Sequence, residues 1–152
     1  MIDLHCHVLP GIDDGPRDFE GAVRILRLAA EAGIKGVAAT PHVVPGHYDN
    51  TAEKVLSLVA ELKDRAGDIP VQVYPGSEIA ICEKTLKGIV GRKYCTINST
   101  RYILLELPPY FRPEDVLGFL ESLSGAGLVP IIAHPERNPQ LQSDVEFIYK
   151  MV

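Results

Sequence analysis

Two histidines close to the start of the chain have the spacing of a metal-binding pair. His5 and His7 flank a single cysteine and follow the mainly apolar segment 1–4, which favours a short β-strand. Residues two apart on a strand point to the same face, so both imidazoles would meet one divalent cation. The alternative is a pair of strand histidines with ordinary hydrogen bonds.

Further histidines and carboxylates follow other short apolar runs, as expected for a metal site built at strand ends. The candidates are Asp14, His42, Glu78, Glu106 and His134. Glu78 and Glu106 follow segments with the character of buried strands, where an unpaired carboxylate is unfavourable. A bound cation would remove that cost, and a salt bridge with an arginine is the alternative. Asp14 has weaker support, because Asp-Asp-Gly is also common in turns.

This mixture of imidazoles and carboxylates indicates a catalytic centre. It suits manganese, iron or zinc, whereas a structural zinc site would favour cysteine thiolates. Water bound to such a cation loses a proton near neutral pH and can then attack phosphorus as hydroxide. Arg137 follows His134 by three residues, and its planar guanidinium can bind two phosphate oxygens. We therefore predict that Arg137 binds the substrate, with a surface salt bridge as the alternative.

Cys95 and Arg101 have the C-x5-R spacing of cysteine-dependent tyrosine phosphatases, but the segment between them argues against that mechanism. Such enzymes need a tight loop whose backbone N–H groups surround a phosphate, usually with glycine. Residues 96–100 contain no glycine and include β-branched side chains. We therefore interpret the match as coincidental.

Composition is that of an ordinary soluble domain. The chain has 152 residues, of which 46% are hydrophobic and 23% charged, enough for one domain with a substantial core. The net charge of -5 disfavours nucleic acid as a partner. No apolar stretch is long enough for membrane insertion and no signal-peptide pattern is present, so the cytoplasm is the expected location. The three cysteines lack C-x-x-C spacing and are expected to be reduced thiols.

Apolar periodicity predicts strands that alternate with helices. Strands are expected near residues 1–4, 37–39, 71–74, 102–105 and 129–133. Helices are expected over 19–33, from Asn50 to Gly67, from Pro113 and from Ser143, with Asn50–Glu53 and Ser143–Glu146 as capping pairs. No element is assigned to residues 79–100. This order predicts a parallel α/β sheet, open or curled into part of a barrel, with ligands at the carboxyl ends of its strands.

Five segments, in order along nearly the whole chain, resemble one enzyme family. They are the run from His5 to Gly15, Thr40-Pro41-His42, Gly76-Ser77-Glu78, Leu105-Glu106 and His134 to Arg137. They resemble the bacterial metal-dependent protein-tyrosine phosphatases of capsule and exopolysaccharide loci, of the CpsB/CapC type, within the polymerase and histidinol phosphatase (PHP) superfamily. The extension Leu-Pro-Gly-Ile-Asp-Asp-Gly after His-x-His separates this branch from other PHP proteins.

The resemblance implies a distorted barrel of seven strands, of which about five are visible in this sequence. It also implies two to three divalent ions at the strand ends, manganese or else iron, zinc or magnesium. The implied ligands are His5, His7, Asp14, His42, Glu78, Glu106 and His134, with Glu78 bridging two ions and Arg137 holding the phosphate. The implied substrate is phosphotyrosine in the tail of a cognate polysaccharide-export tyrosine kinase, hydrolysed without a covalent enzyme intermediate.

The family pattern ends with an Asp-x-His on a late strand, and this chain has no histidine after His134. Residues 1–152 therefore resemble the first two thirds of a single PHP domain. A sheet without its last strands would expose an edge, so we predict self-association into a homo-oligomer or a cost in stability.

Two other functions stay open on the sequence alone. The chain could bind metal or a kinase tail without turnover, because the terminal Asp-x-His is missing. It could also be a PHP phosphoesterase that acts on a small molecule or a DNA end, although the Leu-Pro-Gly-Ile-Asp-Asp-Gly segment argues against this.

Overall fold

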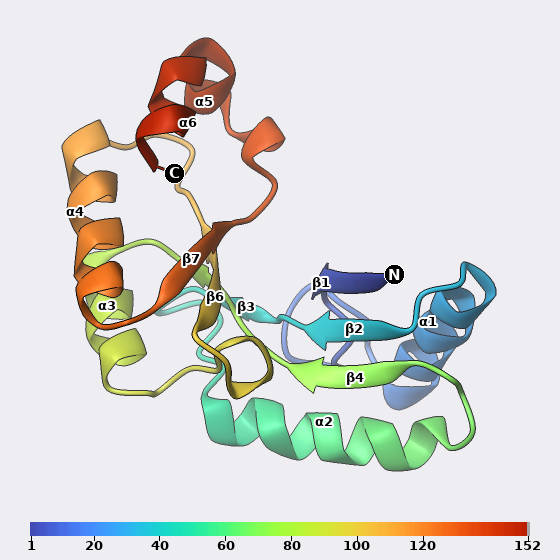
Figure 1. Cartoon of the computed structure of the whole chain (residues 1–152). Helices are drawn as coiled ribbons and strands as arrows, with labels where there is room; N and C mark the ends of the chain where they lie inside the picture. Colours follow the sequence, from blue (N-terminus) through green and yellow to red (C-terminus); the bar gives the residue numbers. More distant parts are fainter. Residues whose placement is uncertain (152) are drawn as a thin grey trace.

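All strand pairs of the structure are parallel, as the alternation of strands and helices predicted. The computed structural model describes residues 1–151. One sheet has the order β1 (Ile2–Cys6), β2 (Gly36–Ala39), β4 (Gln72–Pro75), and the other has the order β3 (His42–Val43), β5 (Glu78–Ala80), β6 (Tyr102–Glu106), β7 (Val129–Ile132). In Figure 1, β2 and β4 of the first sheet run across β6 and β7 of the second. The predicted α/β class is confirmed.

The two sheets are joined by two strands that bend and continue. β2 leads into β3 across Thr40-Pro41, and β4 leads into β5 across Gly76-Ser77. Because β2 pairs with β4 and β3 pairs with β5, both strands bend at the same level. A Cβ atom on Gly76 would lie 2.9 Å from Thr40 Cγ2, so this close approach requires glycine. The bend places His42 and Glu78, the first residues of β3 and β5, side by side.

Helices connect and flank the strands. α1 (Phe19–Glu31) and α2 (Ala52–Ala66) lie beside β2 and β4, whereas α3 (Glu83–Val90) and α4 (Pro113–Gly125) lie on the side of β6 and β7 (Figure 1). The 3₁₀ turn η1 (Ile97–Ser99) precedes β6. After β7 come the 3₁₀ turn η2 (Pro135–Arg137) and the short helices α5 (Pro139–Ser143) and α6 (Val145–Met151).

Each sheet packs against its own helices through a separate buried apolar cluster. In the first cluster, Leu26 of α1 and Leu62 of α2 have no exposed surface and pack with Val37 of β2. In the second, Leu105 of β6 and Leu123 of α4 are likewise fully buried. Full burial of such a side chain contributes about 1.5–3 kcal/mol to the stability of the fold. The two clusters therefore hold the strand ends on two well-packed layers.

Two helix starts differ from the predicted capping pairs. α2 is capped by the hydroxyl of Thr51, and the predicted cap Asn50 is buried next to it with a different role, described below. α6 follows Asp144, whose carboxylate accepts a hydrogen bond from the helix main chain, while the predicted cap Ser143 is the last residue of α5. Both predictions are wrong by one residue, because several neighbouring polar side chains are equally able to cap.

Residues 79–100, which had no predicted element, contain most of β5 together with α3 and η1. β5 has three residues and β3 has two, and strands this short show no readable alternation of apolar and polar positions. The five predicted strands are therefore all present, and their two continuations past the bend were missed.

Each of the two sheets has one edge strand that does not continue into the other sheet, β1 in the first and β7 in the second. Within the described residues, β1 and β7 each pair with one neighbouring strand. On β1 the side chains of Ile2 and Leu4 are exposed. Self-association through such an edge stays a prediction, which sedimentation can test.

No helix among residues 1–151 is long and apolar enough to cross a membrane.

Candidate metal centre

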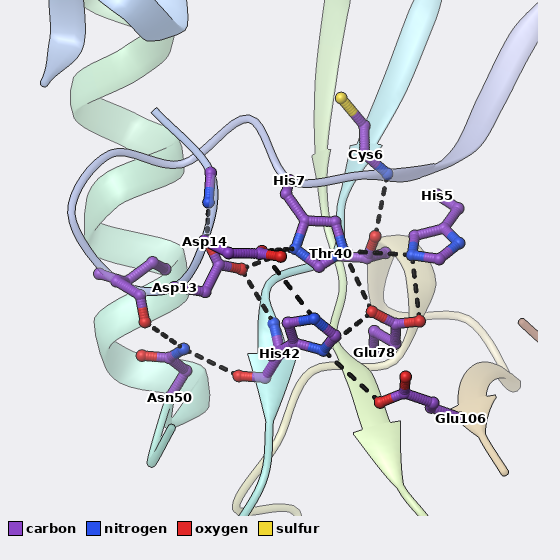
Figure 2. Close-up of polar contacts among 12 residues, drawn as sticks. His5, Cys6, His7, Asp13, Asp14, Thr40, His42, Asn50, Glu78 and Glu106 are labelled. Carbon is purple, nitrogen blue, oxygen red and sulfur yellow. Dashed lines mark hydrogen bonds and ion pairs between the residues drawn. The ribbon is translucent and has the colours of Figure 1, made fainter. Parts of the chain in front are cut away.

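The seven predicted ligands come together where the strands end or bend. His5 lies on β1 and His7 just after it, His42 and Glu78 open β3 and β5, Glu106 ends β6, and His134 follows β7. Their possible ligand atoms form three groups, each with all atoms within 4.8 Å of one another: His5–Glu78–His134, His7–Asp14–His42 and His42–Glu78–Glu106. Figure 2 shows six of the seven side chains turned toward one another.

Glu78 is the centre of this cluster. Its side chain is completely buried, and its carboxylate oxygens lie close to one nitrogen of each of four histidines. The distances are 3.1 Å to His5, 3.0 Å to His7 and His42, and 2.9 Å to His134. A buried carboxylate is strongly unfavourable without positive charge around it, so Glu78 requires cations or protonated imidazoles at these positions.

The spacing of these atoms fits divalent cations. His5 Nε2 and His7 Nε2 lie 3.2 Å apart, and ligands at right angles around a cation with bonds of about 2.1 Å are separated by about 3 Å. His42 Nδ1 and Glu78 Oε2 are 3.0 Å apart and buried, yet neither has a partner in hydrogen-bonding geometry. Buried polar atoms nearly always have partners, so two that face each other unsatisfied indicate a place for an ion.

Contacts within the cluster shift the pKa values of its members. Burial lowers the pKa of His7, but close contacts with the carboxylates of Asp13 and Glu78 outweigh it and raise this pKa to about 10. Contact with Glu78 also raises the pKa of His42. Burial alone would raise the pKa of Glu78, but the imidazoles around it lower that pKa well below its usual range. A cation that binds here replaces imidazole protons, because a metal ligand must offer a lone pair.

His134 reaches Glu78 from a strained backbone. Its φ of +29° lies in the left-handed region, which is uncommon for residues other than glycine. This conformation turns the chain from β7 into η2 and sets His134 Nε2 2.9 Å from Glu78 Oε1. Such strain costs about 1–3 kcal/mol and persists where surrounding contacts impose it, often at functional sites.

Asp14 is the most exposed member of the three groups. Its side chain is 66% exposed, and its Oδ1 lies 3.2 Å from His7 Nδ1 and 3.9 Å from His42 Nε2. His7 and His42 also face the buried Glu78, whereas Asp14 approaches these two histidines from the exposed side. An ion held here would have the most room for water or substrate oxygens.

Asp13 also contacts the cluster, although no local pattern in the sequence indicates a role for it at the site. Its side chain is completely buried, in contrast to that of Asp14. It accepts hydrogen bonds from Gly15 N and His42 N, and it lies beside His7 Nδ1 (Figure 2). The Asp-Asp-Gly sequence indicates a turn, and nothing in that pattern tells a buried carboxylate from an exposed one.

Buried contacts fix the loop that carries these two acids. Asn50 Nδ2 donates to Ile12 O at 3.0 Å and to His42 O at 2.8 Å, and so joins the loop to β3. A Cβ atom on Gly15 would lie 2.5 Å from His7 O, so the turn after the acids requires glycine. The local Asn50–Glu53 pattern predicted a helix cap. The contact between Asn50 and Ile12 joins residues 38 positions apart, so no local pattern indicates it.

A cavity of about 1150 Å³ opens beside the cluster. Its lining includes the cluster, the segment 107–109 after β6 and the segment 136–139 that follows His134. Arg137 lines this cavity, with a side chain 77% exposed and its Nε 3.8 Å from Glu136 Oε1. An exposed guanidinium with so loose a contact is available to an anion that enters the cavity.

Cys95 is unsuited to act as a nucleophile. Its side chain is buried, and burial raises the pKa of the thiol to about 11. At neutral pH such a thiol is almost fully protonated, whereas cysteine nucleophiles react as thiolates. The structure thus agrees with the rejection of the C-x5-R match.

These observations define a parallel α/β protein with a histidine and carboxylate cluster where its strands bend. The family model for capsular polysaccharide synthesis, CpsB/CapC, matches residues 1–152. The chain belongs to the CpsB/CapC family, and the resemblance inferred from the five sequence segments is confirmed.

Relatives of known name match over the whole chain. Tyrosine-protein phosphatase YwqE of Bacillus subtilis (strain 168) is 36% identical, over 100% of this chain and 61% of YwqE. CapC of Staphylococcus aureus is 32% identical, over 100% of this chain and 60% of CapC. The chain therefore spans about three fifths of the length of these relatives.

A solved structure matches the fold closely. It comes from work on YwqE of Bacillus subtilis and CpsB of Streptococcus pneumoniae, described there as metal-dependent tyrosine phosphatases. The TM-score is 0.92 at 36% sequence identity, and the match covers 99% of this chain and 62% of that chain.

Proposed function

We propose that this chain carries the metal centre of a metal-dependent protein-tyrosine phosphatase. The observation that supports this most is the buried Glu78 carboxylate, surrounded by four histidine nitrogens at 2.9 to 3.1 Å and reached from a cavity. Membership of a family whose relatives are named tyrosine-protein phosphatases supports the reaction class.

The proposed cofactor is two to three divalent ions, with manganese as the first choice. Imidazole and carboxylate donors without thiolates suit manganese and iron. Glu78 belongs to two of the three groups and is therefore the proposed bridge between two ions. When bound, these ions would supply a nucleophile from water at neutral pH and balance charge on the transferring phosphoryl group.

The chain's own residues would bind and orient the substrate. Arg137 is proposed to take two oxygens of the phosphate, as a planar guanidinium does best. Leu107, Pro108 and Pro109 give the cavity an apolar wall that suits an aromatic ring. A tyrosine phenol has a pKa of about 10 as leaving group, so the proposal needs no dedicated acid from the protein.

The proposed substrate is phosphotyrosine in the tail of a cognate tyrosine kinase for polysaccharide export. The family description, capsular polysaccharide synthesis, and the names of the relatives support this choice. The proposed location is the cytoplasm, where such a kinase has access to ATP.

The proposal is tested with purified protein loaded with Mn²⁺, using p-nitrophenyl phosphate and a phosphotyrosyl peptide. We expect hydrolysis of both substrates that requires Mn²⁺, stops after chelation and resists vanadate better than a cysteine-dependent phosphatase assayed beside it. Bound manganese without hydrolysis would instead indicate a binding protein without turnover. Hydrolysis of small phosphate monoesters but not of the peptide would indicate a small-molecule phosphoesterase.

The variant Arg137→Ala is expected to weaken substrate binding and leave metal binding unchanged. A lost hydrogen-bond pair to a charged group corresponds to about 1.5–3 kcal/mol, so KM for the peptide should rise roughly 10-fold or more. Steady-state kinetics and metal analysis measure the two quantities. Arg65→Ala is the matched control, because this exposed arginine pairs with Glu61 on α2. Unchanged kinetics in Arg137→Ala would remove Arg137 from the site.

A further inference from the structure

Asp13 lies next to the histidine and carboxylate cluster, and its carboxylate contacts three other residues of the protein. Its side chain is completely buried. Oδ1 accepts from Gly15 N at 2.9 Å, while Oδ2 accepts from His42 N at 3.0 Å and lies 2.9 Å from His7 Nδ1. The carboxylate therefore connects three places in the chain: the end of β1, the turn after it and the start of β3.

His7 is held between Asp13 and the cluster. Its Nδ1 faces Asp13, while its Nε2 lies 3.2 Å from His5 Nε2 and 3.0 Å from Glu78 Oε2. An ionised carboxylate can only accept hydrogen bonds, so this contact places a hydrogen on Nδ1. A neutral His7 then has its lone pair on Nε2, the nitrogen that faces the proposed ligands.

The neighbouring Asp14 is in a different position. Its Oδ1 is also 3.2 Å from His7 Nδ1, but its side chain is 66% exposed and reaches the open side of the cluster. A solvated carboxylate orients a neighbouring ring less firmly than a buried one, because water competes for its oxygens. The two adjacent acids thus have separate roles, with Asp14 available to an ion and Asp13 to the histidine.

We propose that Asp13 is a positioning residue for the metal centre. It fixes the orientation and the tautomer of His7, and through His42 N it fixes the start of β3. This inference rests on the proposed metal centre. Carboxylates that orient a metal-binding histidine in this way typically strengthen metal binding roughly 10- to 100-fold.

The variant Asp13→Asn tests this role with little change in size. Whichever way the amide lies, its NH₂ group faces at least one backbone N–H that the carboxylate accepted. We expect the affinity for Mn²⁺, measured by calorimetry, to fall roughly 10- to 100-fold. Asp3→Asn is the matched control, since Asp3 Oδ1 accepts from the main chain of His5 at 3.0 Å and has no imidazole partner among the described residues. Its affinity for Mn²⁺ should stay close to that of the unmodified protein.

A double-variant comparison separates positioning of His7 from a general structural role. If Asp13 acts through His7, Asp13→Asn should cost much less affinity in a His7→Ala background. An equal loss in both backgrounds would overturn the proposal, as would normal affinity in Asp13→Asn alone. Unmodified protein that binds no Mn²⁺ would contradict the proposed function instead.

A measurement on the unmodified chain covers the case in which Asp13→Asn does not fold. Nitrogen-15 NMR of the imidazoles in the Zn²⁺-loaded protein reports which His7 nitrogen carries hydrogen. The proposal predicts hydrogen on Nδ1, and hydrogen on Nε2 would overturn it.

Discussion

Glu78→Gln is expected to remove most metal binding and, with it, most hydrolysis. The substitution keeps the shape of the side chain but removes the charge at the centre of the cluster, where four imidazoles converge. Loss of one member of a buried charge pair costs about 3–5 kcal/mol, so the affinity for Mn²⁺ should fall by roughly 100-fold or more. Calorimetry and elemental analysis of purified protein measure this directly.

Glu106→Gln is the matched control for this effect. Glu106 is 30% exposed, lies 3.7 Å from His42 and His134, and belongs to one of the three groups, whereas Glu78 belongs to two. We expect Glu106→Gln to lose one ion and Glu78→Gln to lose two. Equal metal content in both variants would show that Glu78 is not a bridge.

Asn50→Ala is expected to give the largest loss of stability among single polar substitutions near the site. It leaves the buried carbonyls of Ile12 and His42 without their donor. Each carbonyl left unpaired costs about 1–3 kcal/mol, so the loss of both contacts should lower the free energy of unfolding by roughly 2–6 kcal/mol. Urea denaturation in the presence of a chelator measures this fold stability apart from metal binding.

Lys54→Ala tests the contact of the Asn50 side-chain oxygen separately from the contacts of its NH₂ group. Lys54 Nζ donates to Asn50 Oδ1 at 2.9 Å, and its loss leaves both carbonyl contacts of Asn50 in place. We expect the unfolding free energy to fall by about 1 kcal/mol, because one amide oxygen loses its donor and water can reach it through the exposed position of Lys54. A loss as large as that of Asn50→Ala would place the important contact at Lys54 and not at the carbonyls.

The convergence of the cluster's side chains could be predicted because several of them leave a local pattern in the sequence. His5 and His7 are two apart at the end of a strand, and Glu78 and Glu106 are acids at positions where a strand would otherwise stay apolar. Such acids need a partner, and the parallel topology brings the strand ends to one place. Convergence therefore followed from the order of the elements before any contact was known.

Asp13 and Asn50 could not be predicted because their roles depend on contacts distant in sequence. Asp13 meets His42 across 29 positions, and Asn50 meets Ile12 across 38. Locally, both residues have the pattern of common surface features, an Asp-Gly turn and a helix cap. The bend in the strands was also hidden, because β3 has only two residues and β5 three.

The central claim, that these side chains hold cations, is tested most directly by anomalous diffraction from crystals grown with manganese. We expect at least two manganese peaks, both within bonding distance of Glu78 oxygens and one bonded to His7 Nε2. Well-ordered His5, His7, His42 and His134 side chains with no anomalous peak between them would contradict it.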